Sequence, residues 1–146
     1  MSLEALQKLR KQAVEELMME LARITQALTR SEDQCRMLEA HIQSDRIAYH
    51  RQTEQGLTIE ALWEWRSRLD AQQSALDQLR RDIHEAASAW QQTNARLVEA
   101  NQEYKLVGRV VEQRRMIHCA EVRHRDQRAT DEAAARSYRV EGTSRP

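Results

Sequence analysis

The sequence predicts one all-α domain over residues 1–146, a long antiparallel two-helix coiled-coil hairpin with an overhanging C-terminal helix. The composition supports this: the 146 residues include three Gly, one Pro and no Phe, and 32% are charged, as in long solvated helices. In addition, eight apolar residues are spaced seven apart: Leu62, Leu69, Leu76, Ile83, Trp90, Leu97, Tyr104 and Val111. A sustained seven-residue repeat forms one apolar stripe along a helix, which has to be buried against another helix.

The first helix is predicted from about residue 3 to about residue 53. Ser2 is placed to cap its N-terminus, and Glu4 lies in the first turn, where the helix dipole favours an acid. This segment has its own apolar stripe, which Ser31 and Asp45 interrupt. The stripe consists of Val14, Leu17, Leu21, Ile24, Leu28, Cys35, Leu38, Ile42 and Tyr49. Two stripes in one chain predict that the two helices pack on each other.

The turn is predicted at about 54–58. Gly56 suits the left-handed position that follows a helix, and Thr58 can cap the helix that comes next. The second helix is expected from about 58 to about 138, because no proline interrupts it. Residues 139–146 are expected to form a frayed tail.

A tight turn at Gly56 folds the helices antiparallel, so that facing residues have numbers adding up to about 111. The two stripes then coincide, with Tyr49 facing Leu62. The first helix runs out opposite about residue 108, so residues 109–138 are expected to have no partner within the chain. Since the apolar stripe continues into this overhang, we expect the overhang to be an interaction element.

Catalysis, cofactor binding and metal binding are not expected. The chain has no glycine-rich phosphate loop and no nucleophile elbow, and a two-helix hairpin offers no concave pocket for a substrate. His118, Cys119 and His124 lie close in sequence, but residues 118 and 124 are about 240° apart around a helix. No carboxylate completes a metal site there. His41 and His50 are interpreted as surface histidines.

The charge balance argues against a nucleic-acid ligand, because 23 basic residues are matched by 23 acidic ones. The arginine-rich stretch after residue 109 is diluted by acids to a net charge of only about +3, unlike the basic arm of a DNA-binding zipper. No apolar stretch approaches the roughly 18–20 residues that span a bilayer, and the N-terminus has no secretory signal. We therefore expect a cytoplasmic protein that binds no nucleic acid and does not insert directly into a membrane.

Trp63 and Trp65 lie about 200° apart around a helix, so they cannot both face the stripe. One of them is expected to be exposed just after the turn. It would serve either as an interface anchor or as a side chain lying flat over the end of the hairpin. Cys35 lies on the stripe and is interpreted as a small hydrophobic residue.

The segment 125–132 resembles the C-terminal signature of the FliJ family of type III export proteins. In that signature a basic residue, an acid and Gln are followed a few residues later by Asp-Glu. Other landmarks occur in a similar order: Trp65 and Leu69 after a central loop with a Gly, Trp90 in mid-helix, and the pair Arg114-Arg115 before the signature. The chain lacks the Phe-Arg-Leu-like start common in flagellar members, which leaves open an injectisome counterpart of the SctO, YscO and HrpO type.

This resemblance implies a non-catalytic stalk and escort component of a bacterial type III protein export apparatus. Family members are similar to the central shaft of rotary ATPases. They insert in or dock on the hexameric export ATPase and link it to the export-gate membrane protein and to escort chaperones. The implied location is cytoplasmic and peripheral to the membrane-bound apparatus. The alternative, which the residues leave open, is a self-associating structural coiled coil or holdase without an ATPase partner.

Three sets of residues follow from these interpretations. Contact with the ATPase is expected at Arg109, Arg114, Arg115, Arg123, Arg125, Asp126, Gln127, Arg128, Asp131 and Glu132. Contact with the export gate is expected at Leu38, Ile42, Tyr49, Trp63 and Trp65. The coiled-coil seam is expected at Val14, Leu17, Leu21, Ile24, Leu28, Leu62, Leu69, Leu76, Ile83, Trp90, Leu97 and Tyr104. The first three gate positions also lie on the apolar stripe, so packing and partner binding compete for them.

Overall fold

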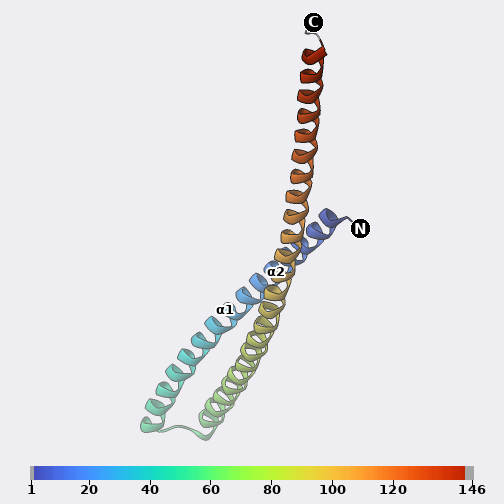
Figure 1. Ribbon diagram of the computed structural model, residues 1–146. Helices are drawn as coiled ribbons and strands as arrows, with labels where there is room; N and C mark the ends of the chain where they lie inside the picture. Colours follow the sequence, from blue (N-terminus) through green and yellow to red (C-terminus); the bar gives the residue numbers. More distant parts are fainter. Residues whose placement is uncertain (1, 144–146) are drawn as a thin grey trace. The chain divides into compact units, whose positions relative to one another are not determined.

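Two long α-helices account for the fold (Figure 1). The computed structural model describes residues 2–143, in which α1 spans Leu3–Gln55 and α2 spans Ile59–Thr143. No strand lies among these residues. The short loop between the helices reverses the chain, so that α2 starts out antiparallel to α1 (Figure 1). The predicted all-α hairpin is therefore confirmed.

The N-caps of both helices and the glycine that follows α1 are the residues that the sequence predicts for these roles. Ser2 Oγ accepts a hydrogen bond from the backbone N–H of Ala5 at 3.2 Å, and Thr58 Oγ1 accepts one from Ala61 at 3.2 Å. Each hydroxyl thus satisfies a backbone donor in the first turn of a helix. Gly56 follows α1 with a φ of 94°, the left-handed conformation that glycine adopts without strain.

Both helices end a few residues beyond the predicted positions. α1 continues to Gln55, past the predicted end at about 53. α2 continues to Thr143, so residues 139–143 of the predicted tail are helical, and residues 144–146 lie outside the described residues. The three alanines Ala133–Ala135 are strong helix formers just before this region, which favours continuation of the helix.

The chain divides into two compact units, and each contains a part of both helices. Unit 2 consists of residues Ala13–Glu99. Unit 1 combines the two chain ends, Met1–Gln12 and Ala100–Pro146.

The core of unit 2 is small. Cys35, Ile42 and Leu76 have exposed fractions of 8%, 5% and 5%, and Leu38 and Ile83 pack against them. Two helices cover each side chain from one direction only, so most of the apolar stripe stays partly open to solvent. Of the predicted seam residues, Leu76 is buried and Leu62 is exposed, and the others are half-buried: Val14, Leu17, Leu21, Ile24, Leu28, Leu69, Ile83, Trp90, Leu97 and Tyr104.

Side-chain contacts between the helices show the register of unit 2. Gln72 Nε2 donates a hydrogen bond to Asp45 Oδ2 at 2.6 Å. The ring of Tyr49 lies 6.1 Å from that of Trp65, between centroids, whereas the predicted register placed Tyr49 opposite Leu62. The observed partner lies three residues farther along α2, so the predicted register was off by about one helical turn.

In unit 1 the first residues of α1 lie beside α2. Arg10 Nη1 and Glu103 Oε2 form an ion pair at 2.5 Å, and the side chain of Gln7 approaches Gly108. Farther along α2, every residue from 112 to 142 is exposed. Because none of these residues is buried, this part of the helix depends on its backbone hydrogen bonds and on local side-chain pairs.

Candidate partner-binding surfaces

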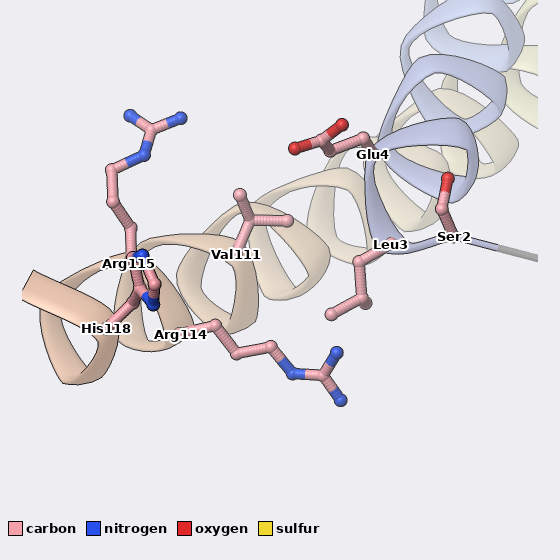
Figure 2. Close-up of a pocket in the computed structure, with 7 residues that line it drawn as sticks. All are labelled: Ser2, Leu3, Glu4, Val111, Arg114, Arg115 and His118. Carbon is pink, nitrogen blue, oxygen red and sulfur yellow. The ribbon is translucent and has the colours of Figure 1, made fainter. Parts of the chain in front are cut away.

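A pocket of about 450 Å³ lies in unit 1, between the first turn of α1 and α2 (Figure 2). Seven residues line it: Ser2, Leu3, Glu4, Val111, Arg114, Arg115 and His118. Figure 2 shows the guanidinium groups of Arg114 and Arg115 pointing away from each other. Two guanidinium groups and an imidazole against one carboxylate make a lining suited to the acidic groups of a partner.

The ten residues predicted to contact an ATPase all lie on α2 in unit 1, and all are exposed. Arg115 Nη1 lies 3.9 Å from Glu112 Oε2, whereas no other described residue forms an ion pair with Arg114. Large apolar side chains lie among these charges, with Met116 64% and Ile117 59% exposed. Exposed apolar groups beside unpaired cations are typical of a helix that binds a partner.

The five residues predicted to contact the export gate all lie in unit 2, but they differ in how far they are exposed. Ile42 belongs to the core, and Leu38 packs against that core. Tyr49 and Trp65 are half-buried, whereas Trp63 is 66% exposed. Trp63 therefore presents most of its surface to solvent, and Ile42 is closed to any partner in this conformation.

The two tryptophans have different surroundings. Trp65 Nε1 donates a hydrogen bond to Gln52 Oε1 at 2.7 Å, and the guanidinium of Arg68 lies 4.9 Å from its ring centroid. Trp63 has an exposed neighbour one turn away, Ile59, which is 75% exposed. Ile59 and Trp63 are thus two exposed apolar side chains one turn apart at the start of α2, which we call the patch of Ile59 and Trp63.

Sequence reasoning missed the N-terminal turn as part of the basic pocket. The predicted register ended the first helix opposite about residue 108, whereas Leu3 lines the same pocket as Val111 and His118. A shift of about one turn accounts for the difference. Leu3 is an apolar residue at the start of α1, and Val111 is the last member of the seven-residue series; this was the available signal.

The model of the family described as Flagellar FliJ protein matches residues 1–143 of the chain. The chain belongs to the FliJ family. The predicted family resemblance is thereby confirmed, and it points to a non-catalytic component of flagellar protein export. No curated protein and no solved structure gave a significant match to the chain.

The FliJ match extends over parts of both units. It includes the basic pocket, the exposed stretch of α2 and the patch around Trp63. Both candidate surfaces therefore belong to the portion of the chain that the family defines.

Among the residues that the structure describes in this FliJ-family chain, no group of three His, Cys, Asp or Glu side chains could hold a metal ion. His118, Cys119 and His124 are exposed positions on α2. Within the described part of α1 and α2, no stretch is long and apolar enough to cross a bilayer.

Cys35 is a buried thiol at the centre of unit 2. Burial raises the pKa of this thiol above its ordinary value of 9.0, and Glu39, which accepts a hydrogen bond from Cys35 Sγ at 3.5 Å, raises the pKa further. Arg80 lies 3.4 Å from the same carboxylate and opposes this effect. Cys35 thus remains a neutral core residue, in contrast to Cys119, which is exposed.

Proposed function

We propose that the chain is a non-catalytic stalk of a flagellar type III export apparatus, and that its C-terminal helix docks on or inserts in the hexameric export ATPase. The observation that carries the proposal is the stretch from Arg109 to Glu132, in which every residue but Val111 is exposed, in a chain of the FliJ family. In this proposal the stretch overhangs the hairpin, and the protein works on the cytoplasmic side, peripheral to the membrane-bound apparatus.

The chemistry of this stretch supports docking by charge and apolar contact together. Arg114, Arg123 and Arg128 are exposed, and no described residue forms an ion pair with any of them. Ile117 exposes 59% of its surface between these cations. A partner surface with carboxylates around an apolar groove would complement both features.

A pull-down with the cognate ATPase tests the proposal. Deletion of residues 109–146 is expected to abolish binding. The double variant Arg114→Glu, Arg115→Glu is expected to weaken binding by about tenfold, because two attractive charges become repulsive. Raising the salt concentration to about 1 M should weaken wild-type binding as well, since it shortens the screening length to about 3 Å.

The matched control reverses two exposed arginines of unit 2, Arg46 and Arg51, to Glu. This control should bind the ATPase as the wild type does. Undiminished binding by the 109–146 deletion would place the contact elsewhere, at the patch of Ile59 and Trp63. Failure of every variant and of the wild type to bind, with a stable oligomer of the full chain, would favour the structural coiled coil or holdase.

We further propose that Trp63 contributes the contact with the export-gate membrane protein, because it is the most exposed of the five residues assigned to that contact. Escort chaperones would bind this same chain, which in the proposal links the ATPase to the export gate. Trp63→Ala is expected to reduce capture of the gate protein while leaving ATPase binding intact. Met37→Ala, at a Met that is 73% exposed elsewhere on unit 2, is the control.

A further inference from the structure

The chain is neutral overall, but its charge is unevenly distributed between the two units. Unit 1 contains 13 Lys and Arg against 8 Asp and Glu, and unit 2 contains 10 against 15, so their net charges are +5 and −5. Charges separated in this way attract the opposite unit of another copy of the same chain.

On unit 2, three carboxylates surround an exposed methionine. Glu15, Glu16, Met19 and Glu20, which we call the acidic strip, are spaced so that they share one side of α1. Arg23, one turn beyond Met19, lies on the same side and lines a pocket with Glu16, Met19 and Glu20. All four residues are exposed, and Met19 exposes 66% of its surface. No described residue forms an ion pair with these carboxylates.

On unit 1, three cations surround another exposed methionine. Lys105, Arg109, Met116 and Arg123, which we call the basic strip, follow one another at intervals of four, seven and seven, and so lie along one side of α2. Glu112 lies on the same side, between Arg109 and Met116, and its carboxylate is 3.9 Å from Arg115 Nη1. All four are exposed, Met116 to 64%, and no described residue forms an ion pair with the cations. With Arg23 and Glu112 counted, each strip has three charges of one sign, one charge of the other sign and an exposed methionine, and the two strips are opposite in net charge.

We propose that the acidic strip of one copy docks on the basic strip of a second copy. The two methionines would provide a flexible apolar contact at the centre, and the charged residues would surround it. Pairing of two basic strips is disfavoured because their cations would repel each other. This head-to-tail association goes beyond the proposed stalk function and is tested without any export partner.

Sedimentation equilibrium of the full chain gives the first test. We expect self-association at about 0.1 M salt, where the screening length is about 10 Å, and its loss at about 1 M, where it is about 3 Å. A chain that stays monomeric at both salt concentrations would overturn the proposal. Association that is unchanged at about 1 M salt would also overturn it, since that result indicates purely apolar pairing.

Charge reversal and charge exchange give the second test. Glu16→Lys with Glu20→Lys, and separately Lys105→Glu with Arg109→Glu, should each weaken self-association by about tenfold. Mixing the two double variants should restore association, because the reversed strips are again opposite in charge. Failure of the mixture to associate would contradict docking of one strip on the other, provided that circular dichroism shows both variants to be as helical as the wild type.

Cross-linking locates the contact. Native Cys119 is exposed and lies one turn from Met116, so Met19→Cys should form an intermolecular disulfide with Cys119 under mild oxidation. The matched control is Met37→Cys, at a methionine that is 73% exposed and outside the acidic strip. The proposal requires a cross-linked dimer for Met19→Cys that disappears when Cys119→Ala is added. Equal dimer yields for Met19→Cys and Met37→Cys would overturn it.

Discussion

Unit 2 and the C-terminal stretch of unit 1, residues 112–142, are both helical, but different interactions stabilise them. In unit 2 a small core around Ile42 and Leu76, and the hydrogen bond from Gln72 to Asp45, connect the two helices. In residues 112–142 every residue is exposed, and interactions of the kind between Arg115 and Glu112 stay within one helix. The comparison indicates that unit 2 has a shape fixed by packing, whereas the C-terminal stretch leaves its side chains available to a partner.

The largest expected effect comes from placing a charge in each region. Leu76→Asp buries a carboxylate without a partner at a position that is 5% exposed, and should lower the free energy of unfolding by about 3 kcal/mol or more. Ile117→Asp, at a position that is 59% exposed, should change it by less than about 0.5 kcal/mol. Urea unfolding followed by circular dichroism measures both. Equal losses would mean that residues 112–142 are packed as tightly as unit 2.

Removal of a carboxylate that connects the helices should have the next largest effect. Asp45→Ala takes away the acceptor of Gln72 Nε2, and Gln72 Oε1 is already buried without a hydrogen bond. An amide left unsatisfied in this way should cost about 1–3 kcal/mol. Asp33→Ala is the matched control, because the pair of Asp33 and Arg36 is exposed and should contribute less than about 0.5 kcal/mol. A loss for Asp33→Ala as large as that for Asp45→Ala would contradict this assignment.

The reaction rates of the two native cysteines compare the two regions without any mutation, because Cys35 lies in unit 2 and Cys119 lies in residues 112–142. Cys119 should be alkylated at least about tenfold faster than Cys35 at about pH 8, because Cys35 reacts only when the hairpin opens locally. The raised pKa of Cys35 adds to this difference, since the thiolate is the reactive form. Because the pKa of Cys35 is higher in the folded chain, folding favours the neutral form of this thiol. Its stabilising contribution is therefore present below the ordinary pKa of 9.0 and is lost as the pH rises through the raised pKa. Mass spectrometry of the two peptides over time measures the rates, and similar rates would show that unit 2 is open.

Much of the fold was accessible from the sequence because it depends on local chemistry. Ser2, Gly56 and Thr58 mark helix ends through their own side chains or backbone freedom, and they occupy these roles in the structure. The register was not accessible in the same way. A seven-residue repeat specifies which side of each helix is buried, but leaves a displacement by one turn open. Interhelical pairs such as Asp45 and Gln72 decide between registers that the stripes alone leave almost equivalent.

For the candidate partner-binding surfaces, too, the apolar pattern alone leaves some roles undecided. The exposure of the arginines after residue 109 could be predicted from the sequence. The first helix was expected to run out opposite about residue 108, so it had no apolar stripe left to cover them. Membership of Ile42 in the core could not be separated from a role in partner binding, because an apolar residue on a stripe suits both. The exposed fractions in the structure show that Trp63 is the tryptophan open to solvent. Helical spacing alone shows only that Trp63 and Trp65 face different directions.

The smallest expected effects concern two glycines, one in each unit. Gly108 lies inside α2 in unit 1, and a Cβ there would be 3.8 Å from the side chain of Gln7, an ordinary contact. Gly108→Ala should therefore stabilise the protein by about 0.5–1 kcal/mol, because alanine loses less backbone entropy in a helix. Gly56→Ala meets no atom within 4 Å but has a φ of +94°, so it should destabilise by about 1 kcal/mol. Thermal unfolding of both variants measures these shifts, and their opposite signs are the decisive feature. A loss of stability for Gly108→Ala would show that α2 departs from regular helix at this position, and that the conformational freedom of glycine is used in unit 1 as it is in the turn.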